Sequence, residues 1–106
     1  MRVPCPYLHG DVELTEERVQ HIREGHPELL PQYHDRIVET LLAPDEVRRS
    51  ARSKSARLFS RWFDDIIGGK HVVVVVVSET APVRHWVVTA YVVRKLGPGV
   101  LEWKRD

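Results

Sequence analysis

Residues 70–95 read KHVVVVVVSETAPVRHWVVTAYVVRK and predict two neighbouring β-strands. Valine is β-branched and favours strands, and six valines follow one another from Val72 to Val77. Because this run is apolar on both alternating faces, we expect a central strand at 70–77. The pattern is interrupted at 80–82, so the next strand, at 84–95, should pair antiparallel with the first after a short turn.

Further strands are expected on both sides of this pair. Residues 46–52 and 56–63 are rich in β-branched and aromatic side chains, and the tail around 100–103 can add a fifth strand. The short link at Gly68 and Gly69 favours an antiparallel meander, because a parallel pair needs a crossover of a dozen or more residues.

The first 44 residues have a helical hydrophobic period. Thr15 can cap a first helix, which Gly25 and Pro27 end. Pro31 suits the first turn of a second helix that stops before Pro44. Helices first and strands after predict an α+β fold, with two N-terminal helices packed on one face of a four- to five-stranded antiparallel sheet.

The length and the single cysteine limit the organisation of the chain. We expect one domain, 1–106, with a helical part at about 12–44 and a sheet part at about 45–104. Cys5 alone can form neither an intramolecular disulfide nor a multi-cysteine zinc site, and it favours a reducing compartment, so we expect a cytoplasmic protein. The longest apolar run is far shorter than the roughly 20 residues of a membrane helix, and the N-terminus lacks the apolar core of a signal peptide.

The formal net charge of +1 conceals an uneven distribution. The first 46 residues contain ten acidic and four basic residues, whereas 47–63 contain no acidic residue and six basic ones: Arg48, Arg49, Arg52, Lys54, Arg57 and Arg61. Clustered basic side chains favour a polyanionic partner such as RNA. The alternative is an ordinary solvated edge that faces the acidic helices of the same molecule.

The predicted strand at 84–95 has two different faces. Alternation places one set of side chains toward the helices, namely Trp86, Val88, Ala90 and Val92, and a polar set on the open face, namely His85, Thr89, Tyr91 and Lys95. Thr89 and Tyr91 would then lie about 7 Å apart, within reach of one phosphodiester. The strand propensity of Thr and Tyr is an alternative reason for their presence.

The segment HIREGHPE, residues 21–28, carries two histidines where the first helix ends. Histidine exchanges protons near neutral pH, so His21 and His26 are candidate general acids or bases, although capping or helix-dipole roles would also explain them. A metal site is not expected, because the five-residue spacing turns the second histidine about 140° round a regular helix. No cofactor is expected either, since the chain lacks a glycine-rich phosphate loop.

Together, HIREGHPE, the basic strands and HWVVTAY at 85–91 resemble the small phage- and mobile-element-associated nucleases of the barnase/EndoU/colicin/RelE superfamily. The resemblance covers roughly residues 12–96. It implies a helical pair on a four-stranded antiparallel sheet and a site on that sheet that cleaves RNA without metal. It also implies a toxin-like role, with RNA as partner and an antitoxin or immunity protein as inhibitor.

The resemblance also assigns site residues. The family's helix-end histidine corresponds best to His26, with His21 as a second candidate, and its strand Ser or Thr corresponds to Thr89. Its strand cation corresponds to Arg61 or Arg57, with Lys70 as a further choice. In such a site the histidine acts as base or acid while the cation and the hydroxyl hold the phosphate.

Other nucleic-acid contacts are expected from basic and aromatic side chains of the sheet, namely Arg48, Arg49, Arg52, Lys54, Arg57, Lys70, Tyr91 and Lys95. Tyr91 can stack on an unpaired base or donate a hydrogen bond. Two alternatives remain open. A binding module would hold RNA or DNA without cleavage, and a homodimer or toxin–antitoxin interface would use an apolar open face formed by Val73, Val75, Val87 and Val93.

Overall fold

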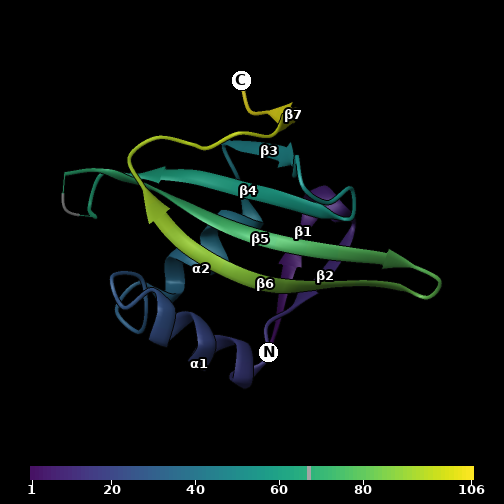
Figure 1. Ribbon diagram of the computed structural model, residues 1–106, viewed down its shortest axis with the longest axis horizontal. Helices are drawn as coiled ribbons and strands as arrows, with labels where there is room; N and C mark the ends of the chain where they lie inside the picture. The colour runs from purple at the N-terminus through teal and green to yellow at the C-terminus, as the bar shows by residue number, and fades with distance from the viewer. Residues whose placement is uncertain (67) are drawn as a thin grey trace.

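The computed structural model describes residues 1–66 and 68–106. The elements follow one another as β1 (Arg2–Cys5), the short 3-10 helix η1 (Pro6–Leu8), β2 (Gly10–Glu13), α1 (Glu16–Gly25), α2 (His34–Leu42), β3 (Glu46–Arg49), β4 (Ala56–Phe63), β5 (Lys70–Thr80), β6 (Val83–Val93) and β7 (Val100–Lys104). The α+β class predicted from the sequence is confirmed (Figure 1). Neither α-helix in the described part of the chain is long and apolar enough to cross a bilayer.

The described strands form one mixed sheet of seven, in the order β1-β2-β6-β5-β4-β3-β7. Its pairs are antiparallel except that of β2 with β6, which is parallel and joins Glu13 to Trp86. The sheet therefore has more strands than the four or five expected, and a β-hairpin precedes the helices. Val3 and Val12 are buried and paired in this hairpin. Its strands have only four residues each, too short for alternation to give a clear signal.

The two helices begin where local chemistry permits. The Thr15 side chain accepts a hydrogen bond of 3.1 Å from the Arg18 amide, which confirms the predicted cap of α1. Helix α2 begins at His34, later than expected, because the preceding residues form turns that bury Leu29 and Leu30. Helix α1 contacts β6, and α2 contacts β1, β4 and β5; Figure 1 shows α1 alongside β6 and α2 behind the central strands.

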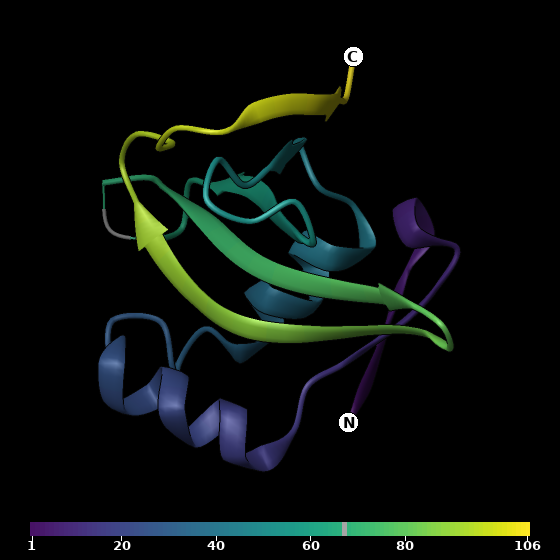
Figure 2. The same ribbon diagram turned by 45° about the vertical axis from the view of Figure 1, so that its right-hand side comes forward.

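The sheet is strongly curved, and its two edge strands approach each other (Figures 1 and 2). Tyr7, which follows the edge strand β1, packs edge-on against Phe59 on β4 with 5.8 Å between ring centroids. The same ring lies 5.9 Å from Trp103 on the opposite edge strand β7. The concave side therefore encloses the apolar core, which includes Ile37 and Leu41 from α2.

A β-bulge in β6 changes which side chains face the core. Val75 pairs with Thr89 but Val76 pairs with Val87, so Val88 is an extra residue in the ladder. The alternation predicted from the sequence holds from Thr89 onward. On the N-terminal side of Val88 it is wrong: Trp86 shares the open face with Thr89 and Tyr91, while His85 and Val87 face the core side.

The open face is less apolar and less exposed than expected. Residues 94–99 connect β6 to β7, and Gly97 and Pro98 lie above Leu58 and Val75 on this face. Val73 keeps only 2% of its surface exposed there. Val87 is equally buried, but on the core side, so the four valines expected to form an interaction patch do not form one.

Candidate functional site

His26 reaches the open face of the sheet round the edge of β6. It is the C-cap residue of α1, and its amide donates a hydrogen bond of 2.6 Å to the Ile22 carbonyl. Its ring centroid lies 5.8 Å from that of Tyr91 on β6. The imidazole is 36% exposed, so it can contact both this strand and a ligand from solvent.

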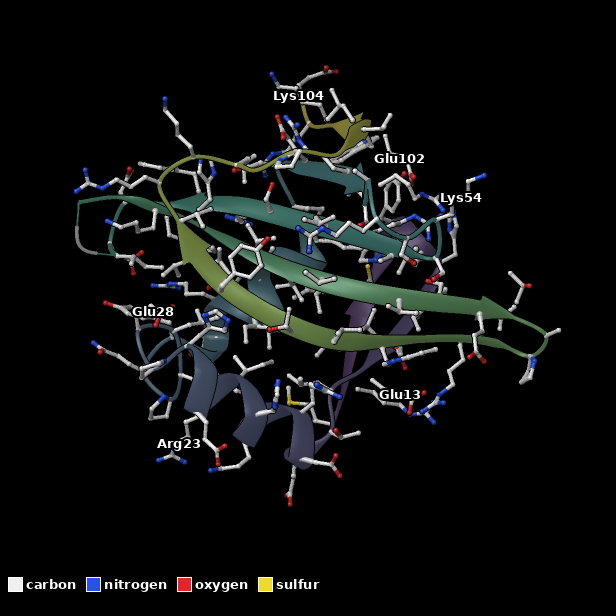
Figure 3. The ribbon with its side chains drawn as sticks, in the orientation of Figure 1. Glu13, Arg23, Glu28, Lys54, Glu102 and Lys104 are labelled. Atoms are coloured by element: carbon white, nitrogen blue, oxygen red, sulfur yellow. The ribbon has the colours of Figure 1, made fainter. Side chains whose placement is uncertain are left out.

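Glu28 is the hydrogen-bond partner of this histidine. Its Oε1 atom lies 3.2 Å from His26 Nδ1 (Figure 3 shows Glu28 beside the end of α1). A proton on Nδ1 directed at the carboxylate leaves Nε2 with a lone pair, ready to accept a proton. Glu28 is absent from the residues predicted from the sequence, although the His-Pro-Glu order is a signal for such a pair.

Tyr91 supplies a hydroxyl group near this imidazole, and Thr89 supplies another on the same face of β6. Both are half-buried, and they pair with Val73 and Val75, which places them on one face two residues apart. A tyrosine phenol is protonated at neutral pH and can donate a hydrogen bond, and burial raises the pKa of Tyr91 further. The structure thus brings His26, Tyr91 and Thr89 to one region of the open face.

Arg61 and Arg57, the two preferred candidates for the strand cation, lie on the other face. They pair with Val72 and Val76, whose side chains belong to the core. Arg61 donates a hydrogen bond of 3.1 Å from Nη1 to the Ala43 carbonyl. The structure does not bring these arginines together with Thr89.

Arg57 belongs to a cluster at the far end of the sheet from Glu28 (Figure 3 labels Glu102 there). The Glu102 carboxylate accepts hydrogen bonds of 2.8 Å from both Arg57 and Arg49, and one of 2.7 Å from Tyr7. Burial acts to raise the pKa of Glu102, but the hydrogen bonds from Arg57, Tyr7 and Arg49 outweigh it and lower the pKa to about 2. Two of the six clustered basic residues are therefore held by a carboxylate inside the molecule, which offsets one of their two positive charges.

The other basic residues predicted to contact nucleic acid differ in whether a carboxylate lies near them. Arg48 forms an ion pair of 3.0 Å with Glu46, and Lys70 lines a cavity of about 410 Å³ together with Glu28. Lys95 is exposed just after β6. Arg52 and Lys54 are exposed on the β3–β4 loop and take part in no ion pair within the described part of the chain.

His21, the second histidine candidate, is an exposed residue of α1 one turn before the helix end. Among the described residues it makes no ring contact of the kind that joins His26 to Tyr91. The part of the chain that the structure describes also includes no group of three His, Cys, Asp or Glu side chains arranged to hold a metal ion.

Comparison with protein-family models, with curated protein sequences and with solved structures gave no match.

Proposed function

We propose that the chain is a metal-independent endoribonuclease whose site is formed by His26, Tyr91 and Thr89. The observation that carries this proposal is the 5.8 Å contact between the His26 and Tyr91 rings. This contact places a solvent-accessible imidazole beside the face of β6 that carries the Tyr91 and Thr89 hydroxyl groups. The resemblance of the sequence to the barnase/EndoU/colicin/RelE superfamily supports the same reaction.

In this reaction His26 acts as the general base. Nε2 takes the proton of a ribose 2′-hydroxyl while Glu28, hydrogen-bonded to Nδ1, holds the ring in place and stabilises the imidazolium that forms. The 2′-oxygen forms a bond to phosphorus, the bond from phosphorus to the 5′-oxygen breaks, and that oxygen takes a proton from water. The products are a 2′,3′-cyclic phosphate and a free 5′-hydroxyl.

The hydroxyl groups of β6 stabilise the charge that develops on the phosphate. The Tyr91 phenol is protonated at neutral pH, and it donates one hydrogen bond to a non-bridging oxygen. Thr89, on the same face, donates another.

Arg52 and Lys54 replace Arg61 and Arg57 as the cations that attract the RNA backbone. Both side chains are exposed, and neither has an ion-pair partner among the described residues. Their charge is therefore available to phosphate groups outside the molecule.

The test is cleavage of an end-labelled RNA in EDTA by the purified protein, with the 2′-deoxy form of the same sequence beside it. We expect cyclic-phosphate products from the RNA and none from the deoxy strand. His26→Ala should lose about 10²- to 10⁴-fold in rate, as the loss of a positioned base typically does.

The matched control is His9→Asn, which removes an exposed histidine from the β1–β2 turn. His9 has a φ of 56°, a left-handed conformation that asparagine tolerates, so this variant should fold and cleave like the wild type. Equal cleavage by His26→Ala and the wild type would overturn the proposal.

A further inference from the structure

A cavity of about 390 Å³ lies on the open face directly beside Tyr91. Its floor is the apolar surface of Leu58 and Val75, which pair with each other on β4 and β5. Tyr91 forms one wall. The other walls come from two loops, residues 50–52 between β3 and β4, and Gly97 with Pro98 in the connection to β7.

This lining has the composition of a site for a flat heterocycle on an anionic chain. The floor and Tyr91 are apolar or aromatic, while Ser50 and the loop backbones provide hydrogen-bonding groups at the rim. Arg52 is a cation at the rim, and none of the described lining residues carries a carboxylate.

Neighbouring cavities differ in their charged lining. The one of about 290 Å³ at the other side of residues 94–99 is lined by three acidic residues, Asp45, Glu46 and Asp106, together with Lys104 and Arg105. The one of about 410 Å³ near α2 is lined by Glu28 and Lys70. Of these three cavities, the one beside Tyr91 has a cation and no carboxylate in its described lining, so its charge favours a polyanion.

We propose that this cavity holds one unpaired base of a single-stranded RNA, and that the strand's adjoining phosphate lies at Tyr91 and His26. The inference rests on the proposed function, since Tyr91 belongs to both the cavity wall and the contact with His26. A base within a duplex is stacked on both faces and paired along one edge, so it cannot enter a cavity closed by two loops. The substrate class is thus single-stranded RNA or an unpaired loop.

The experiment measures binding separately from cleavage. A 2′-O-methyl hexanucleotide, which lacks the nucleophilic hydroxyl, is titrated into the full chain and followed by fluorescence anisotropy and by the amide resonances of Ala51 and Gly97. A duplex of the same sequence is the comparison ligand. We expect the single strand to shift both resonances and the duplex to shift neither.

Val75→Phe fills the floor of the cavity with a residue that strands tolerate well. It should weaken binding of the single strand about tenfold to a hundredfold, the range for the loss of one stacked base. Val77→Phe is the matched control, because Val77 lies two residues along the same strand on the same face and is outside the cavity lining. It should bind like the wild type.

Arg52→Ala gives an independent check at the rim. The Arg52 backbone amide donates a hydrogen bond to Ser50 Oγ, so the loop keeps this bond in the variant. We expect weaker binding and a smaller salt dependence of affinity.

The two proposals can fail separately. Wild-type affinity in Val75→Phe, or duplex bound as tightly as single strand, overturns the cavity inference even if RNA is cleaved through His26. Binding in the cavity without any cleavage of a natural RNA overturns the nuclease and keeps the base site.

Discussion

The Tyr7 hydroxyl donates a hydrogen bond of 2.7 Å to the Glu102 carboxylate, joining residues 95 positions apart in the sequence. It connects the segment after β1, at one edge of the sheet, to β7 at the other. Arg49 and Arg57 bond to the same carboxylate. The cluster around Glu102 therefore stabilises the fold. Because it uses two arginines of the basic segment, these two are not available to a ligand.

The cluster makes stability depend on acid pH. The pKa of Glu102 in the folded chain is about 2, below its ordinary value of 4.5, so its contribution to stability is complete above 4.5 and is lost as the pH falls toward 2. The wild type should lose ~1–2 kcal/mol of unfolding free energy between about pH 5 and pH 2 from this group, a value reduced for solvent screening. Urea unfolding of Glu102→Gln should show a correspondingly flatter acid limb, and identical limbs would contradict the assignment.

Alanine substitutions at the two adjacent glycines of the turn before β5 should lower stability by different amounts. Gly68 and Gly69 have φ values of 77° and 72°, so alanine at either costs ~1–2 kcal/mol in backbone strain. A Cβ at Gly69 would in addition collide with the ring of Trp62. Thermal unfolding should therefore show a larger fall in Tm for Gly69→Ala than for Gly68→Ala. Equal decreases in Tm would mean that the Trp62 ring moves aside at no cost in free energy.

Removing the carboxylate that holds His26 should slow catalysis without weakening substrate binding. Glu28→Gln should lower kcat about tenfold to a hundredfold, as a misplaced catalytic group does, and leave KM unchanged. Glu24→Gln is the matched control, because Glu24 is an exposed carboxylate at the end of α1, four residues before Glu28, and bonds only to Gln20 among the described side chains. A rise in KM alone in Glu28→Gln would assign this residue to binding.

Thr89→Val removes one hydroxyl and keeps the shape of the side chain on its strand. We expect a decrease of about tenfold to a few hundredfold in kcat, less than for His26→Ala, since the phosphate has one hydrogen-bond donor fewer. Thr80→Val, at the exposed end of β5, should have no effect on the rate. Single-turnover kinetics on one RNA would compare the three variants. A Thr89→Val variant that cleaves RNA at the wild-type rate would remove Thr89 from the proposed site.

Arginines on the two faces of the sheet should differ in their effect on RNA affinity. Neutralising Arg52 and Lys54 should lower the slope of log affinity against log salt by about one unit for each phosphate that the variant no longer binds. Arg61→Ala should leave the slope unchanged and instead lower stability, because Arg61 bonds to the Ala43 carbonyl and lies over the Phe63 ring. An unchanged slope in the Arg52 and Lys54 variants would show that neither side chain touches the backbone of the RNA.

Long periodic segments are the part of this fold that the sequence predicts. The helix cap at Thr15 and the long strand pair around Val72 to Val77 follow from local residue preference, which packing did not override. The β1–β2 hairpin could not be predicted in the same way, because Val3 and Val12 are buried by contacts with distant segments and not by a pattern of their own.

The candidate site is predictable only in part, for two physical reasons. Residue type predicts His26 and Thr89 as site residues, and the structure brings His26 to Tyr91, which lies on the same strand as Thr89. Arg57 lies in a segment without acidic residues and so looks available to a ligand, but its partner Glu102 comes from the last strand. Charge counted along the chain cannot reveal a counterion supplied from 45 residues away.

The single extra residue in β6 shifts the alternation of side chains between the two faces of the strand. Thr89 and Tyr91 would keep their face in a chain that lacks Val88, because they pair with β5 beyond the bulge. The residues before the bulge would keep their faces as well, because without the extra residue Val87 would still pair with Val76 and Trp86 with Val77. A regular ladder that retained Val88 would instead turn Trp86 toward the interior and His85 toward the outer surface. The bulge, and not the number of residues in the strand, thus keeps an aromatic ring on the same face as the hydroxyl groups.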